Sequence, residues 1–194
     1  MKKNNLIFSL FLSFLLIFFP YNFILSDANK KKETFDKNEM VDKAKIYFAD
    51  LSEGVGIIIE RSFNDFGKPS AYIEGEEFSG AFFGGLRYGG GKIYFKDGTV
   101  KDVYWNGPSL GFDLGANASK VFTLIYNLDL NNSNKLFVRF PDVEGTLYIA
   151  AGLAINYQKK NGIIITPVRS GLGLRAGINL GYTKYTRKKS LIPF

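Results

Sequence analysis

Cysteine and histidine are both absent from this chain of 194 residues. Without them, the Ser-His-Asp and Cys-His arrangements of nucleophilic enzymes cannot form, and zinc and copper sites lose their usual ligands. A chain without cysteine also forms no disulfide bond, so its stability depends on burial of its core. Catalysis by carboxylates or lysines stays open, but no pattern in the sequence requires a reaction, a metal ion or a cofactor.

The first 28 residues have the features of a secretion signal. Lys2 and Lys3 give a basic start, and residues 6–19 form an almost unbroken apolar run. This run is shorter than the roughly 20 residues that span a bilayer. Ser26 and Ala28 have the spacing that a signal peptidase prefers, which predicts cleavage after Ala28 and export to the periplasm. An uncleaved membrane anchor is the alternative.

Cleavage would leave one domain behind a short tether. It would remove two Lys and one Asp, so the formal charge would fall from +7 to +6. Residues 29–38 are polar and charged, which predicts a flexible basic linker. We interpret residues 39–194 as a single domain, because a chain of this length suits one hydrophobic core.

An apolar stripe at three- and four-residue steps predicts helices over residues 41–66. Gly54 and Gly56 interrupt the stripe, which indicates two helices or one kinked helix. Gly67 is a candidate C-terminal cap. The stripe is most simply the buried face of helices packed on a sheet. A helix that lies on a membrane or binds a partner is the alternative.

Downstream of the helices, short apolar segments alternate with glycine-rich bends. Strands are predicted at 71–74, 78–86, 93–95, 100–105, 109–115, 119–128, 146–157, 163–168 and 171–183. Asp97-Gly98 and Asn161-Gly162 predict hairpin turns. Residues 88–92 predict a flexible turn, and residues 131–140 a short helix or turn. The pattern predicts a mainly β fold, a small antiparallel β-barrel of about eight strands with an N-terminal helical segment.

The sequence argues against two further functions, nucleotide binding and an outer-membrane barrel. Gly89-Gly90-Gly91 before Lys92 is similar to a phosphate-binding loop, but a strand follows it where such a loop needs a helix. We therefore expect no nucleotide and no nucleic-acid partner. The terminal Phe194 is typical of outer-membrane barrels, but residues 184–189 carry four basic side chains where a membrane strand needs alternate apolar ones.

The candidate site centres on residues 104–117, which hold the only tryptophan, Trp105. Asp113 lies in an apolar segment, and a carboxylate there is costly to bury unless it is paired. We predict that Arg175 or Arg169 pairs with it across the sheet. The candidate residues for a ligand site or an internal ion pair are Arg87, Trp105, Asp113, Arg169 and Arg175. None is assigned to catalysis or to a metal ion.

Several motifs spread along the chain, taken together, are specific to one family. They are Pro69-Ser70-Ala71-Tyr72-Ile73, Gly75-Glu76-Glu77, Gly84-Gly85-Leu86-Arg87-Tyr88-Gly89, Val103-Tyr104-Trp105-Asn106-Gly107-Pro108-Ser109, Gly111-Phe112-Asp113-Leu114-Gly115, Tyr126-Asn127-Leu128, Arg139-Phe140, Pro167-Val168-Arg169-Ser170-Gly171, Asn179-Leu180-Gly181-Tyr182 and Pro193-Phe194. With these motifs the chain resembles the EipA family, envelope integrity proteins of alphaproteobacteria, from about Glu39 to Phe194.

The resemblance implies a periplasmic β-barrel with a role in envelope integrity, and it supplies no catalytic residues. We expect a non-enzymatic protein that binds an envelope lipid, an envelope polysaccharide or another envelope protein. The basic charge suits anionic envelope components. The alternative is an enzyme that acts on envelope glycans with paired carboxylates, such as Asp113 with Glu76 or Glu77.

Overall fold

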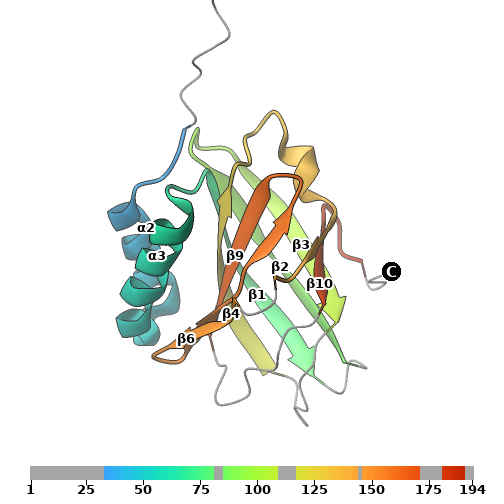
Figure 1. The fold of residues 1–194 in the computed structure, drawn as a ribbon. Helices are drawn as coiled ribbons and strands as arrows, with labels where there is room; N and C mark the ends of the chain where they lie inside the picture. Colours follow the sequence, from blue (N-terminus) through green and yellow to red (C-terminus); the bar gives the residue numbers. More distant parts are fainter. Residues whose placement is uncertain (1–32, 81–84, 109–116, 144–145, 171–180, 191–194) are drawn as a thin grey trace, which may run out of the picture. The chain divides into compact units, whose positions relative to one another are not determined.

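In the part of the chain that the structure describes, two helices precede one large antiparallel sheet (Figure 1). The computed structural model describes residues 33–80, 85–108, 117–143, 146–170 and 181–190. The helical elements are α2 (Lys37–Phe48), the 3-10 turn η1 (Ala49–Leu51), α3 (Ser52–Phe66) and the 3-10 turn η3 (Ser133–Leu136). The strands are β1 (Ala71–Gly80), β2 (Leu86–Phe95), β3 (Val100–Pro108), β4 (Asn117–Tyr126), β5 (Arg139–Pro141), β6 (Tyr148–Ala150), β7 (Leu153–Ile155), β8 (Gln158–Lys160), β9 (Ile163–Ser170) and β10 (Tyr182–Thr186).

The helical segment divides at Ala49 and not at its glycines. Ala49 has a positive φ of 49°, and η1 leads directly into α3. Two helices are found in this part of the described chain, as one of the two predicted alternatives had it, but Gly54 and Gly56 lie inside α3 and do not divide them. A Cβ atom on Gly54 would stand 2.6 Å from the carbonyl oxygen of Ala150, so this glycine lets the β6–β7 hairpin approach the helix. Gly67 ends α3 with a φ of 77°, as predicted.

Both helices cover one face of the sheet, which confirms that their apolar stripe is a buried face (Figure 1). Their side chains form an apolar core with the outward-facing residues of the sheet. Phe48 and Phe122 have ring centroids 6.4 Å apart, and Phe66 and Tyr126 are separated by 5.4 Å. Among the described residues, no helix has both the length and the apolar character needed to cross a membrane.

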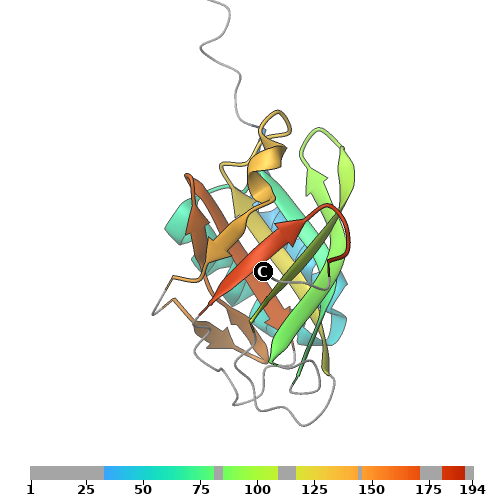
Figure 2. The same ribbon diagram turned by 90° about the vertical axis from the view of Figure 1, so that its right-hand side faces the viewer.

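The sheet curls until its two ends meet, which gives a barrel-like fold. Its strand order is β5-β10-β3-β2-β1-β4-β9-β7-β6, and β8 pairs with β9. Asp142, next to β5, forms an antiparallel bridge with Gln158 of β8. The Val143 N–H donates to the Tyr157 carbonyl oxygen at 2.8 Å beside this bridge. The predicted mainly β, barrel-like fold is confirmed, with ten strands in the described residues, and Figure 2 shows the opposite walls crossing at an angle.

A second apolar core fills the inside of the barrel. Its residues alternate along the strands with the outward-facing ones, as the two-residue period of a strand requires. The buried set comprises Ala71, Ile73, Ile93, Phe95, Val103, Trp105, Val121, Ile125, Leu128, Leu136, Phe140, Ile163, Ile165 and Tyr185. The strands that lie between the helices and the barrel interior are therefore buried on both faces.

Three predicted segments differ in the structure. Residues 71–80 form one strand, β1, instead of belonging to two. Residues 88–92 run through the middle of β2 and do not form a turn. The segment 146–157 holds a hairpin and not one strand, because Ala151 and Gly152 turn the chain between β6 and β7 with φ values of 41° and 79°.

Both predicted hairpin turns are confirmed. Asn161-Gly162 joins β8 to β9 with φ values of 52° and 79°, and Gly98 lies between β2 and β3 with a φ of 87°. Residues 131–140 include η3 and the start of β5. The predicted strand at 109–115 lies wholly outside the described residues, and so do residues 171–180 of the predicted strand at 171–183.

On the inner face of β2, the neighbouring strands leave no space for side chains at the glycine positions. Trp105 lies opposite Gly89 in the register, and a Cβ atom on Gly89 would come within 2.1 Å of the indole ring. The ring also reaches Gly75 of β1, where a Cβ atom would stand 2.7 Å from it. A Cβ atom on Gly90 would instead meet the side chain of Tyr104 at 2.9 Å, on the outer face. Glycine is thus required for packing on the inner face.

We expect Gly89→Ala to lower the free energy of unfolding by about 1–3 kcal/mol, because the added methyl group overlaps a fully enclosed ring. Gly90→Ala, at the adjacent position, should change it by less than about 1 kcal/mol, since the Tyr104 ring is only partly buried and has room to move. Urea unfolding of both variants checks this. Equal losses would show that the two faces of β2 do not differ in packing.

Candidate functional site

Three of the predicted site residues, Arg87, Trp105 and Arg169, lie together inside the barrel. The carboxylate of Glu77 lies among them. Glu77 of β1 accepts a hydrogen bond from Trp105 Nε1 at 2.7 Å and another from Arg169 Nε at 3.1 Å. Arg87 of β2 points into the same interior. All four side chains belong to residues that are at most 5% exposed, so the charges of Glu77, Arg87 and Arg169 are stabilised by one another and not by water.

A second carboxylate, Asp142, anchors the other half of this arrangement. The side-chain amides of Asn156 and Gln158 donate to its Oδ1 atom at 2.7 and 2.8 Å. A terminal nitrogen of Arg87 lies 3.8 Å from its Oδ2 atom and donates to Thr183 Oγ1 at 2.6 Å. Two carboxylates therefore balance two guanidinium groups.

Arg169 connects the two halves, because its Nη1 atom donates to Asn156 Oδ1 at 2.8 Å. Gln158 Nε2 also donates to Thr183 Oγ1 at 2.7 Å, and Tyr185 OH donates to Gln158 Oε1 at 3.3 Å. We call this set the interior polar network. Its members are Glu77, Arg87, Trp105, Asp142, Asn156, Gln158, Arg169, Thr183 and Tyr185.

The network fixes the protonation of its charged groups. Burial alone would raise the pKa of Glu77, but the charges of Arg169 and Arg87 and the Trp105 hydrogen bond outweigh burial and lower this pKa. Burial opposes the charge of Arg169 as well, yet Glu77 raises the pKa of that guanidinium. Burial and the charge of Arg169 lower the pKa of Arg87. Glu77 is thus an ionised structural group, unsuited to donating a proton near neutral pH.

The sequence prediction covers only part of this network. Arg87, Trp105 and Arg169 are brought together, whereas Asp113 and Arg175 lie outside the described residues. The hydrogen bonds found for Arg169 go to Glu77 and Asn156. Sequence reasoning missed Glu77 as the interior partner, although the alternation of Ala71, Ile73, Gly75 and Glu77 places it on the apolar face. No local pattern marks Asp142, Asn156, Gln158 or Thr183, which depend on how the barrel closes.

The adjacent residues Glu76 and Glu77 of β1 lie on opposite faces of the sheet. Glu77 points inward, and Glu76 is exposed on the outer face. The two therefore cannot act as an acid–base pair in one cleft. Among the described residues, no group of three or more carboxylates is placed to hold a metal ion.

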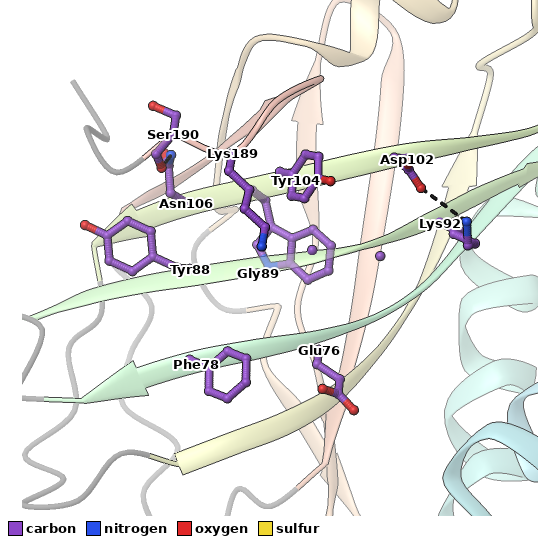
Figure 3. Close-up of a pocket in the computed structure, with 13 residues that line it drawn as sticks. Glu76, Phe78, Tyr88, Gly89, Lys92, Asp102, Tyr104, Asn106, Lys189 and Ser190 are labelled. Carbon is purple, nitrogen blue, oxygen red and sulfur yellow. Dashed lines mark hydrogen bonds and ion pairs between the residues drawn. The ribbon is translucent and has the colours of Figure 1, made fainter.

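An open groove lies on the outer face of the same three strands, with a volume of about 550 Å³ (Figure 3). We call it the outer groove. It is lined by Glu76 and Phe78 from β1, by Tyr88 to Lys92 from β2, by Asp102, Tyr104, Trp105 and Asn106 from β3, and by Lys189 and Ser190. Its volume is in the range of roughly 300–1,000 Å³ typical of small-molecule sites.

The strand register arranges the outward side chains as three rows across β1, β2 and β3. The rows are Phe78, Tyr88 and Asn106, then Glu76, Gly90 and Tyr104, then Glu74, Lys92 and Asp102. Gly90 occupies the middle of this block and has no side chain. The Tyr104 ring lies beside this position, 2.9 Å from where a Cβ atom of Gly90 would stand, so the floor of the groove here is bare backbone next to a ring.

The segment after β10 borders the groove. Asn106 Nδ2 donates to the Ser190 carbonyl oxygen at 3.0 Å, which holds this segment beside β3. In Figure 3 the Lys189 side chain extends over β2. The Asn106 side chain is buried, and its Oδ1 atom has no hydrogen-bond partner within the described structure.

Comparison with known proteins decides the family. Residues 33–194 match the family described as EipA, Envelope integrity protein A. The chain belongs to the EipA family. A crystal structure of a beta-barrel-like, uncharacterized protein from Brucella abortus is 40% identical to this EipA-family chain, with a TM-score of 0.75 over 84% of this chain and 99% of that one. A search of curated proteins found no match.

Membership of the EipA family confirms the resemblance seen in the sequence, and the description of the family fits a role in the cell envelope. The Brucella abortus structure supports the same barrel-like fold. Neither comparison names a ligand or a reaction.

We expect Glu77→Gln to lower the free energy of unfolding by about 3–5 kcal/mol, because it leaves the buried Arg169 charge without its partner. The combined change with Arg169→Met should cost less than the sum of the two single changes. Urea unfolding of the four chains measures this coupling. Glu60→Gln is the matched control, since the Glu60–Lys37 pair is exposed and worth at most about 1 kcal/mol. Additive losses would show that the two buried groups are independent.

The lowered pKa of Glu77 also predicts a pH dependence. A carboxyl group whose pKa is lower in the folded state stabilises the fold above its ordinary value of 4.5 and loses this contribution as the pH falls through the folded-state value. Unfolding measured from pH 7 to pH 3 should therefore show a steeper loss for the natural chain than for Glu77→Gln. Parallel curves would mean that Glu77 is not the group responsible.

Proposed function

We propose that this protein is exported to the periplasm, where it supports envelope integrity and resistance to envelope stress by binding an envelope component in the outer groove. The proposal is carried by the contrast between the two faces of β1, β2 and β3. Inside, the Trp105 ring and the ion pair of Glu77 with Arg169 fill the space. Outside, the groove is open and lined by rings, so a ligand would approach from there.

Export is supported by the basic and apolar start of the chain, with cleavage after Ala28. The mature chain would begin with the basic linker at residues 29–38, ahead of the folded domain. Its positive charge favours an anionic environment. A lipid, a polysaccharide and another envelope protein are the ligand classes consistent with such a position.

A binding role fits the groove better than catalysis does. Glu76 and Asp102 both border it, but Asp102 is paired with Lys92 at 3.2 Å. The buried Glu77 is paired with Arg169 on the opposite face of the sheet. An enzyme that acts on envelope glycans would need two carboxyl groups positioned around one bond.

A strain that lacks the gene tests the proposal. We expect the natural full-length gene to restore survival in detergent with a chelator, and Phe78→Ala and Tyr104→Ala to fail although both proteins accumulate folded in the periplasm. Val100→Ala should restore survival, since Val100 lies outside this groove and is as exposed as Phe78, at 45%. Intact mass of the periplasmic protein should place its first residue at Asn29.

Two results would contradict the proposal. Full restoration by both groove variants would remove the groove from the function. Cleavage of an envelope glycan by the purified protein, detected as a new product mass, would overturn the non-enzymatic role.

A further inference from the structure

The rings of the outer groove surround a floor without a side chain. A Cβ atom on Gly90 would stand 2.9 Å from the Tyr104 ring, so this ring lies directly against the bare backbone of β2. Phe78 is 45% exposed on the neighbouring strand, next to Tyr88 in the register. Aromatic side chains on three adjacent strands therefore frame a shallow space that one flat ring could enter.

Polar groups of both signs stand around these rings. Lys92 and Asp102 form an ion pair at 3.2 Å, and both side chains are more than half exposed. Glu76 lies between Phe78 and this pair, and Lys189 borders the groove from the other side. A ligand on the rings would thus meet hydrogen-bond donors and acceptors at its edges.

Asn106 carries a buried acceptor atom without a hydrogen bond in the described structure. Its residue is 1% exposed, and Oδ1 has no partner within the described structure, while Nδ2 is held by Ser190. A buried acceptor without a donor is costly. A hydroxyl group at this end of the groove would satisfy it.

We propose that the outer groove binds a sugar ring of an envelope oligosaccharide, an assignment that rests on the proposed function. A pyranose has an apolar C–H face and a periphery of hydroxyl groups. The face matches the Tyr104 and Phe78 rings, and the periphery matches the mixed charges and the Asn106 amide. Hydroxyl groups both donate and accept, so they pair with carboxylates and amines alike.

Other occupants fit these groups less well. An acyl chain offers no hydrogen bond to the charged groups of Glu76, Lys92 and Asp102 that border the groove. A peptide strand needs a free sheet edge, whereas β1, β2 and β3 each pair on both sides.

The test is calorimetric titration of the mature chain with the water-soluble polysaccharide of the producing bacterium's envelope, freed of acyl chains by mild alkali. We expect binding by the natural chain, and about tenfold weaker binding by Tyr104→Ala, as the loss of one ring contact predicts. Tyr104→Phe keeps the ring and should bind within about twofold of the natural chain. Val100→Ala is the control outside the groove, and dextran is the control polymer. Thermal unfolding verifies that each variant is folded.

Three results would overturn the assignment. Equal binding by Tyr104→Ala and the natural chain would place the sugar elsewhere. Loss of binding in Tyr104→Phe as large as in Tyr104→Ala would remove ring stacking from recognition. Binding to vesicles of phosphatidylethanolamine and phosphatidylglycerol that depends on Tyr104, without polysaccharide binding, would identify a lipid site and leave the proposed function standing. If neither probe binds and the groove variants restore survival in the deletion strain, the proposed function falls as well.

Discussion

One buried carboxylate joins distant strands of this barrel. Glu77 of β1 accepts hydrogen bonds from Trp105 of β3 and Arg169 of β9. These two strands lie two positions away from β1, one on each side. Backbone hydrogen bonds connect only neighbours, whereas these side-chain contacts span five consecutive strands. Because ions this deeply buried are costly when unpaired, the contacts favour one register and one curvature of the sheet over others.

The same tryptophan links the inside of the barrel to its outside. Its ring leaves no space for side chains at Gly75 and Gly89, and glycine continues through the next position, Gly90, on the outer face. The outer groove thus lies directly behind the most tightly packed part of the interior. Binding surfaces are best supported by rigid elements beneath them, and here the support and the surface share one strand.

Local chemistry determined how much could be predicted. The turn at Asn161-Gly162 follows from residues that accept a positive φ, and the helices follow from their apolar period. The three glycines of β2 resemble a turn when taken alone, because what requires glycine lies in the neighbouring strands: the Trp105 ring beside Gly89 and the β1 backbone beside Gly91. Arg87, Trp105 and Arg169 were recognisable as unusual residues in apolar surroundings. Their partners Glu77 and Asp142 could be assigned only after strand register and barrel closure were known.

The bridge between Asp142 and Gln158 has a consequence for solubility. It is a narrow junction, supported by side-chain hydrogen bonds from Asn156 and Gln158 to one carboxylate. Short junctions of this kind are where local opening requires the least free energy. An opened junction would expose the unpaired backbone groups of β5 and β8, and free strand edges pair readily with other chains. By holding this junction closed, the hydrogen bonds to Asp142 keep those strand edges covered.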